Sequence, residues 1–378
     1  MINATLSEIN ILAMEYQTIV AKVRVERYEV AVNSAEEARR TQEAHLSGRR
    51  YDPQFKFEPV QRESIRQVSD FRERLDQFAS PWLDPLRSTV GYILQTLLDS
   101  ESHSADAITD RTAAMYGEIA PQVLDSALEQ LAAPFVPFHE AQDIDATATV
   151  RYFRAALESV GLADWSAIVE PRMNAMMDVS GERREIRVRD GSVFSRTAVA
   201  RLLVHEIGCH VFRSASGGRQ PVTLLGYGLG DYLPTEEGLG CWQEEQTGLS
   251  DPADSRRLAL RYLAAARSLD SPLFDVYSEL RQYADHAQAF ETAARAKRGF
   301  ADTAQRGSHL KDKVYFEGFR SVTEYLKKNP EDLALLYVGK VPLSLLPLVN
   351  DALQREELVP GAFGPALVPD LLDVLPKS

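Results

Sequence analysis

Two histidines and a glutamate in the stretch from Leu202 to Arg213 have the chemistry for metal-dependent hydrolysis. The imidazoles are at His205 and His210, and the carboxylate of Glu206 directly follows the first of them. Histidine nitrogens bind zinc, and a neighbouring glutamate can activate a water molecule for attack on a carbonyl group. These residue types therefore predict a hydrolytic zinc site.

The spacing of the two histidines requires an irregular helix. In the better-known His-Glu-x-x-His motif the histidines are four positions apart and share one helix face, whereas His205 and His210 are five apart. On a regular helix, five positions place two side chains roughly 140° apart, so they could not share one metal ion. A π-bulge accommodates one extra residue and turns both rings to the same side. We therefore expect an i→i+5 turn near Gly208, a residue of low helix propensity.

A third ligand is expected because a catalytic zinc ion normally has three protein ligands and one open position. After His210 and a loop, the sequence reads Pro234-Thr235-Glu236-Glu237. Thr235 is a suitable N-cap, which would place both carboxylates in the first turn of a new helix. Either glutamate would complete a His-His-Glu set; alternatively, both only complement the helix dipole.

Four further residues close to these positions have two interpretations each. Glu244 and Glu245 follow Glu237 by two helical turns, and one of them could orient a ligand histidine or both could be solvated. Cys209 and Cys241 could supply thiolates to the metal ion, but as small buried hydrophobic residues they need no chemical role. We interpret both cysteines as packing residues.

Other short blocks follow the histidine stretch in order, and together they resemble one known family. The blocks are Arg219-Gln220-Pro221, Tyr227-Gly228-Leu229, Thr235-Glu236-Glu237-Gly238-Leu239, Arg295-Ala296-Lys297-Arg298-Gly299, Asp302-Thr303, Gly307, Lys311-Asp312, Val314-Tyr315 and Gly318, with a weaker upstream match at Tyr51-Asp52-Pro53-x-Phe55. Their types and order resemble the microtubule-associated tyrosine carboxypeptidase family, which has a bacterial branch labelled by a QEGLA motif. The resemblance covers about residues 205–318 and implies a zincin-like metallopeptidase.

The resemblance assigns roles to four residues. It implies that His205, His210 and Glu237 bind zinc and that Glu206 is the general acid and base. The chain departs from the family pattern in three places: Cys209 stands where threonine is usual, Glu236 where the QEGLA label has glutamine, and Gly240 where it has alanine. None of these departures removes a ligand, so they bear on substrate choice.

A carboxypeptidase must also hold the free α-carboxylate of its substrate, and a guanidinium group does this through two parallel hydrogen bonds. We predict that Lys297 and Arg298 anchor this carboxylate, with Arg213 as the second candidate. Tyr227 and Tyr315 are predicted hydroxyl donors to the developing oxyanion. The alternatives are that Lys297 and Arg298 only form a basic helix C-terminus, that Arg213 is a solvated helix end, and that the tyrosines only pack.

Composition excludes several classes of protein. The chain has 378 residues, of which 44% are hydrophobic and 26% charged, and a net charge of −13, which argues against nucleic acid or an anionic membrane as the main partner. No apolar run is long enough for a membrane helix, and the first residues lack the features of a signal peptide. Two cysteines give no disulfide framework. We therefore expect a cytoplasmic protein.

Hydrophobic periodicity predicts an α+β fold that is mostly helical, with a small β-sheet beside the metal-binding helix. The expected helices lie in residues 1–48, 60–79, 86–101, 105–132, 149–160, 254–298, 314–328, 331–337 and 343–355, and the expected strands at 166–170, 175–179 and 185–189. Ser195 is expected to cap the helix that carries the histidines, and the tail from Pro360 to Pro376 to lie over the surface. We divide the chain into a helical N-terminal region, 1–148, and a metallopeptidase domain, 149–378.

These observations together predict a zinc carboxypeptidase that removes an aromatic or apolar C-terminal residue from a peptide or protein tail. One alternative is an aminopeptidase or dipeptidyl-peptidase, because the dipeptidyl-peptidase III family also has a His-Glu-x-x-x-His spacing followed by a Glu-Glu pair. That family is much longer, and its remaining pattern is absent. A second alternative is a non-catalytic regulator with a structural zinc ion, which Glu206 disfavours because a structural site needs no water-activating carboxylate.

Overall fold

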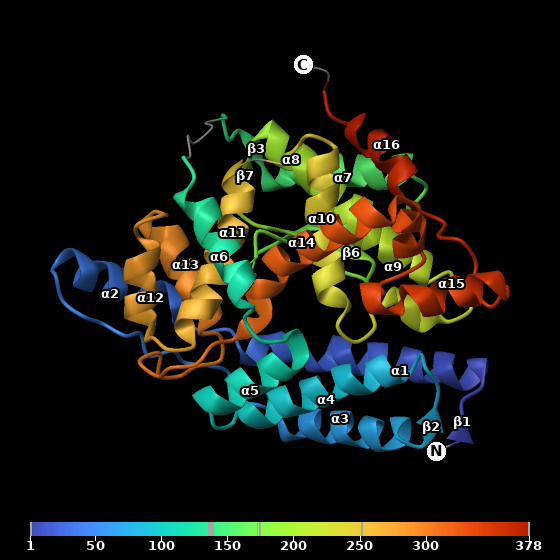
Figure 1. Ribbon diagram of the computed structural model, residues 1–378, viewed down its shortest axis with the longest axis horizontal. Coiled ribbons are helices and arrows are strands. Elements are labelled where there is room, and N and C mark those ends of the chain that lie inside the picture. The colour runs from blue at the N-terminus through green and yellow to red at the C-terminus, as the bar shows by residue number, and fades with distance from the viewer. Residues whose placement is uncertain (1, 135–139, 172, 174, 251, 377–378) are drawn as a thin grey trace. The chain divides into compact units, whose positions relative to one another are not determined.

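The chain forms a mostly helical α+β structure with small sheets, as the sequence predicts. The structure is a computed structural model that describes residues 2–134, 140–171, 173, 175–250 and 252–376 (Figure 1). Within this described part, every helix is too short or too polar to span a membrane.

Two compact units make up the chain, and each draws on separate stretches of sequence. Unit 1 consists of Met1–Asn3, Thr18–Phe135 and Pro252–Glu317, and unit 2 of Ala4–Gln17, Val136–Asp251 and Gly318–Ser378. Residues 252–317 thus group with the N-terminal helices. The division into independent domains at residue 148 stays a prediction.

Unit 1 is built from amphipathic helices that bury their apolar faces against one another. Its core includes Val68, Phe71 and Leu75 of α3, which packs on α4, while α11 packs on α6, α12 and α13. Its elements are β1 (Ile2–Asn3), η1 (Val25–Tyr28), α2 (Ser34–Leu46), α3 (Arg62–Leu75), β2 (Phe78–Ala79), α4 (Asp84–Asp99), α5 (Ala105–Tyr116), α6 (Pro121–Ala132), α11 (Pro252–Ser268), α12 (Leu273–Leu280), α13 (His286–Ala296) and η4 (Leu310–Asp312). Strands β1 and β2 pair in parallel.

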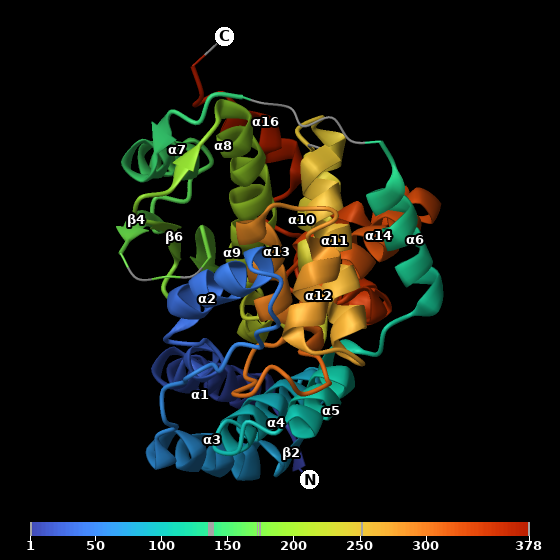
Figure 2. The same cartoon turned by 90° about the vertical axis from the view of Figure 1, so that its left-hand side faces the viewer.

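Unit 2 contains a three-stranded sheet and the helices that carry the predicted ligands (Figure 2). Its elements are β3 (Ile144–Asp145), α7 (Ala146–Ser159), β4 (Ser166–Glu170), β5 (Met177–Ser180), β6 (Glu185–Arg189), β7 (Val193–Phe194), α8 (Arg196–Leu202), η2 (Leu203–Val211), α9 (Phe212–Gly217), η3 (Thr223–Gly226), α10 (Tyr232–Gln246), η5 (Pro330–Tyr337), η6 (Leu343–Leu345), α15 (Leu346–Gln354), η7 (Pro365–Leu367) and α16 (Val368–Leu372). Helices α1 (Leu6–Val23) and α14 (Lys313–Lys328) each have one end in either unit.

The small sheet has the strand order β4-β6-β5, with β4 parallel and β5 antiparallel to β6. Ile186 and Val188 of β6 are buried and alternate with partly exposed charged residues, as the sequence predicts for a half-exposed strand. The predicted bounds of β4 and β6 are confirmed, whereas β5 lies at 177–180 rather than 175–179. Helix α7 covers β4 and β6, and β5 contacts the histidine helix, so the sheet supports the site.

The histidine helix is one continuous run of helical residues from Arg196 to Gly217, with a π-helical centre, η2. Ser195 caps it, since the Ser195 hydroxyl accepts a hydrogen bond from the Ala198 backbone N–H at 3.1 Å. Both the cap and the i→i+5 turn are confirmed predictions.

Two expectations about neighbouring segments are wrong. Helix α10 begins at Tyr232, so Thr235 lies inside the helix and does not cap it; Pro234 falls in the first turn, where a missing N–H costs nothing. The C-terminal tail is also not a surface segment throughout, because α16 packs on η2 and buries Val368 and Leu371.

Helices α10 and α14 cross at two glycines whose backbones touch. A Cβ atom built at Gly318 would lie 2.0 Å from the carbonyl oxygen of Pro234, and one built at Gly238 would lie 2.3 Å from the backbone of Gly318. Any side chain at either position would push α10 away from α14. This contact fixes how closely α10, which carries Glu236 and Glu237, approaches α14.

We expect Gly318→Ala to lower the free energy of unfolding by about 1–3 kcal/mol, because the added methyl group meets rigid backbone. Urea denaturation measures the change. Gly91→Ala in α4 is the control: its nearest atom would be a flexible Arg72 side-chain nitrogen at 3.7 Å, so the higher helix propensity of alanine should stabilise by up to about 1 kcal/mol. A Gly318→Ala variant as stable as wild type would show that the helices do not depend on this contact.

Candidate metal centre

Three side chains from η2 and α10 meet at one point. One ligand atom each from His205, His210 and Glu237 lies within 4.8 Å of the other two. A Glu237 carboxylate oxygen, Oε2, is 3.4 Å from His205 Nε2 and 3.7 Å from His210 Nε2. The structure thus brings together the residues that the sequence proposes as ligands, with two nitrogens and one oxygen facing a common centre.

The π-helix makes this convergence possible. Residues 203–211 form i→i+5 turns, and the rings of His205 and His210 have centroids 4.8 Å apart. The Gly208 carbonyl oxygen of this irregular segment accepts a hydrogen bond from the Tyr337 hydroxyl at 3.0 Å, and that hydroxyl accepts in turn from the Gln243 amide. Gly208 also leaves room for α16, since a Cβ atom there would lie 3.3 Å from Val368.

Each histidine has its second ring nitrogen next to a carboxylate. His205 Nδ1 is 2.6 Å from Glu244 Oε1, and His210 Nδ1 is 2.9 Å from Glu236 Oε1. With Nδ1 as the donor, Nε2 keeps a lone pair directed at the common centre, which is the tautomer that a metal ligand needs. Glu244 thus takes the orienting role that the sequence left open, and Glu245 is exposed.

Cations balance the two orienting carboxylates. Arg201 lies 3.2 Å from Glu244, while Arg213 and Lys340 both contact Glu236. Burial by itself would raise the pKa of Glu236, but Lys340, Arg213 and His210 hold it far below its ordinary range. Glu236 is therefore ionised and accepts hydrogen bonds only.

Glu206 stands beside the ligands without belonging to the ligand set. Its Oε2 atom is 3.9 Å from His210 Nε2, and 12% of its side chain is exposed. Burial raises the pKa of Glu206, and the negative charges of Glu237 and Asp178 raise it further, against the lowering effect of the two histidines. A carboxylate with a raised pKa takes up a proton more readily, which suits a general base.

Both cysteines lie close to the candidate centre, and their packing role stays a prediction. Cys209 is fully buried, and its thiol donates to the Glu236 backbone carbonyl oxygen at 3.3 Å. Burial raises the pKa of Cys209 well above its ordinary value and that of Cys241 to about 12. Cys209, His210 and Glu236 nevertheless present ligand atoms within 4.8 Å of one another and form a second group that could hold a metal ion.

Two of the five residues predicted to bind substrate lie in unit 2 and have internal partners. Arg213 is wholly buried and donates to Glu236 and to the carbonyl oxygens of Leu336 and Val341. Its donors are thus occupied by internal acceptors, and its carboxylate-binding role stays a prediction. The Tyr227 hydroxyl donates to Gln17 at 2.7 Å.

The other three lie in unit 1. The Lys297 ammonium group is buried and donates to the carbonyl oxygens of Ser268, Gln305 and Gly307 at 2.7–3.0 Å. Burial lowers the pKa of Lys297 to about 7. Tyr315 lies under the guanidinium group of Arg261.

Unlike the ammonium group of Lys297, the guanidinium group of Arg298 has N–H donors that make no hydrogen bond with the described residues. Its side chain is 19% exposed, and the nearest carboxylate oxygen, on Asp312, is 3.8 Å away. That distance is beyond hydrogen-bonding range, and the residues that the structure describes offer Arg298 no hydrogen-bond acceptor.

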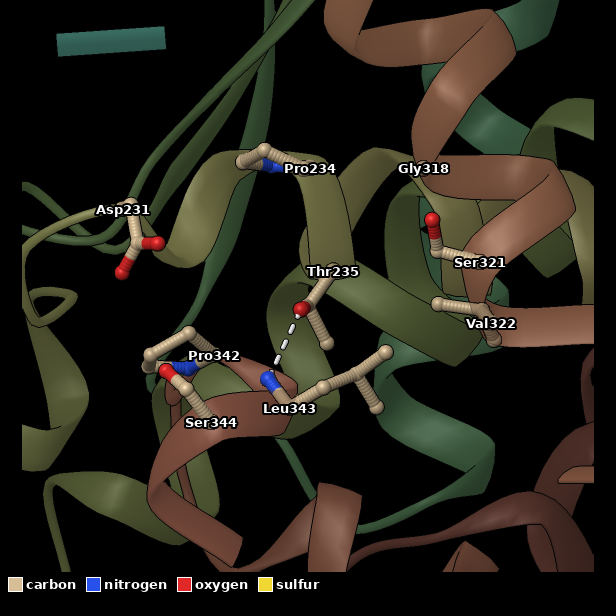
Figure 3. Close-up of a pocket in the computed structure, with 9 residues that line it drawn as sticks. All are labelled: Asp231, Pro234, Thr235, Gly318, Ser321, Val322, Pro342, Leu343 and Ser344. Carbon is tan, nitrogen blue, oxygen red and sulfur yellow. Dashed lines mark hydrogen bonds between the residues drawn. The ribbon is translucent and has the colours of Figure 1, made fainter. Parts of the chain in front are cut away.

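A small cavity of about 220 Å³ lies next to the start of α10 (Figure 3). It is lined by residues of α10, of α14 and of the segment around Pro342, namely Asp231, Pro234, Thr235, Gly318, Ser321, Val322, Pro342, Leu343 and Ser344. The Thr235 hydroxyl accepts a hydrogen bond from the Leu343 backbone N–H at 3.0 Å, which ties this segment to α10. None of the predicted site residues lines this cavity.

A family model and several curated proteins match parts of this chain. The family model for "Microtubule-associated tyrosine carboxypeptidase" matches residues 46–376. The chain is 34% identical over 150 residues to microtubule-associated tyrosine carboxypeptidase 1 of Mus musculus, which covers 37% of this chain and 30% of that protein. It is 31% identical over 146 residues to a putative tyrosine carboxypeptidase, MATCAP2, of Homo sapiens, covering 37% and 27%. The chain thus matches less than a third of the length of these curated relatives.

We expect Tyr337→Phe to lower the free energy of unfolding by about 1–3 kcal/mol, because the Gly208 carbonyl group and the Gln243 amide both lose a buried partner. Chemical denaturation measures the loss. Tyr152→Phe on α7 is the matched control in the same unit: the described residues offer its hydroxyl no hydrogen-bond partner, so the change should stay within about 0.5 kcal/mol. Equal effects of the two variants would contradict a special role for Tyr337 under the π-helix.

Proposed function

Because the chain belongs to the microtubule-associated tyrosine carboxypeptidase family, we propose that it is a zinc-dependent carboxypeptidase that removes a C-terminal residue from a peptide or protein tail. The observation that carries this proposal is the meeting of His205, His210 and Glu237 beside Glu206. An aromatic or apolar terminal residue and a cytoplasmic location are part of the proposal.

The donor set fits zinc. Two imidazole nitrogens and one carboxylate oxygen are the ligands of many catalytic zinc sites, which keep one position open. Both histidines have Nδ1 bound by a carboxylate, so Nε2 is the atom presented to the ion. When bound, zinc would supply Lewis acidity that polarises the scissile carbonyl and acidifies water.

Glu206 would act as the general base and then as the general acid. Its carboxylate accepts the proton of the attacking water, and the same oxygen returns that proton to the leaving amine. The raised pKa of Glu206 favours the first step. Tyr227 and Tyr315 remain proposed donors to the oxyanion.

The contacts of the cations favour Arg298 as the anchor of the substrate carboxylate. Arg213 and Lys297 already donate to internal acceptors, whereas the guanidinium group of Arg298 is largely buried and lacks a hydrogen-bond acceptor among the described residues. Guanidinium binds carboxylate through two parallel hydrogen bonds. We therefore place Arg298 first and retain Lys297 and Arg213 as weaker candidates.

We expect Glu206→Gln to keep one zinc ion per chain and to lose nearly all turnover, because an amide cannot take the proton from water. His205→Ala should lose both the zinc ion and the turnover. Metal analysis after dialysis and hydrolysis of a fluorescent peptide measure the two effects. Full activity in Glu206→Gln would assign water activation to another residue.

Arg298→Ala should reduce kcat/KM on peptides with a free C-terminus by roughly 30- to 900-fold, which corresponds to about 2–4 kcal/mol for a carboxylate that loses its partner. Peptides with an amidated C-terminus should be poor substrates of the wild type and lose little more in the variant. Mass spectrometry of both peptide sets shows which end shortens.

Arg306→Ala removes an exposed arginine of the same unit and is the control. Efficient wild-type cleavage of amidated peptides, or of internal bonds, would refute the carboxypeptidase assignment. Shortening from the N-terminus would favour the aminopeptidase or dipeptidyl-peptidase alternative. Zinc binding without cleavage of any peptide would favour the regulator.

A further inference from the structure

We propose that Glu236 and Lys340, together with Arg213, are positioning residues for His210, so that the chain segment 336–341 forms part of the metal centre. This inference rests on the proposed zinc site and adds residues that neither the motif nor the family comparison assigns. It starts from an asymmetry between the two ligand histidines.

Both oxygens of Glu236 accept from charged or polar donors. Oε1 is 2.9 Å from His210 Nδ1 and 3.2 Å from Lys340 Nζ, and Oε2 accepts from Arg213. The carboxylate plane cannot rotate without breaking one of these contacts. Glu236 therefore holds the His210 ring in one orientation.

The three charges are nearly inaccessible to water. The side chains of Arg213, Glu236 and Lys340 are 0%, 2% and 10% exposed. Charge-assisted hydrogen bonds are stronger without competing water, and a buried charge that loses its partner is costly. The group is therefore stable only when all three members are present.

Backbone contacts fix the two cations from the far end of the sequence. Arg213 donates to the carbonyl oxygens of Leu336 and Val341, both at 2.7 Å. The Lys340 backbone N–H donates to Leu225 at 2.7 Å, and the Lys340 carbonyl oxygen accepts from Leu229 at 3.1 Å. A few residues later, the Leu343 N–H bonds Thr235, one position before Glu236 (Figure 3).

The carboxylate beside His205 has a smaller set of cations among the described residues. There, Arg201, whose side chain is 15% exposed, contacts Glu244. Glu236, the partner of His210, contacts two cations, Arg213 and Lys340.

Glutamine cannot replace Glu236 in this arrangement, although the QEGLA label has glutamine there. An amide has one acceptor oxygen and one donor nitrogen, whereas His210 Nδ1, Lys340 and Arg213 are all donors. In either orientation the amide nitrogen would face a donor. The pairing with two cations and His210 therefore requires a carboxylate at position 236.

The test is the affinity of the full-length protein for zinc, measured by competition with a chromophoric chelator. We expect Glu236→Gln to bind zinc about 10- to 100-fold more weakly, with faster zinc release, while circular dichroism shows an intact fold. Lys340→Met should change affinity in the same direction and serves as the second variant if Glu236→Gln does not fold. Glu245→Gln, the same substitution at an exposed position of α10, should bind zinc as the wild type does.

The visible spectrum of the cobalt(II)-loaded protein adds a readout of ligand geometry, which should change in both variants but not in the control. Zinc affinity within twofold of wild type in folded Glu236→Gln and Lys340→Met, with unchanged cobalt spectra, would overturn the inference and leave the proposed function intact. Failure of the wild type to bind zinc would instead refute the proposed function itself.

Discussion

Four largely buried glutamates surround the two imidazoles of the metal centre, and their mutual repulsion is the constraint that the rest of unit 2 must compensate. Each has a carboxylate oxygen within 3.9 Å of an imidazole nitrogen; the four are Glu206, Glu236, Glu237 and Glu244. Unpaired buried charges are costly. The folded unit places Arg201 against Glu244, and Arg213 and Lys340 against Glu236, which offsets part of this repulsion.

The helical turn that brings His205 and His210 together could be predicted from sequence because its determinant is local, whereas Glu237 was proposed as a ligand from the family resemblance. The spacing of His205 and His210 allows only a widened helical turn if both are to bind one ion, and the structure has that turn. The strands at 166–170 and 185–189 were predictable for a similar reason, since alternation along a few residues determines which face is buried.

The supporting cations could not be predicted, because their partners are distant in sequence. Lys340 is more than 100 positions from Glu236, and no motif marks it. Arg213 looked like a free cation at a helix end, whereas tertiary contacts occupy its donors. We predicted too late a start for α10 because threonine is a residue type that often caps helices. In the structure the Thr235 hydroxyl instead accepts a hydrogen bond from the Leu343 backbone N–H.

The packing of α16 on the π-helix has a consequence for biosynthesis. The histidines are translated near the middle of the chain, but the residues that brace their helix, Lys340 and the α16 pair Val368 and Leu371, emerge from the ribosome much later. A nascent chain therefore holds its two imidazoles before it holds their supports. The π-helix therefore gains these packing partners only after the segments around Lys340 and α16 have been synthesised and have folded onto it.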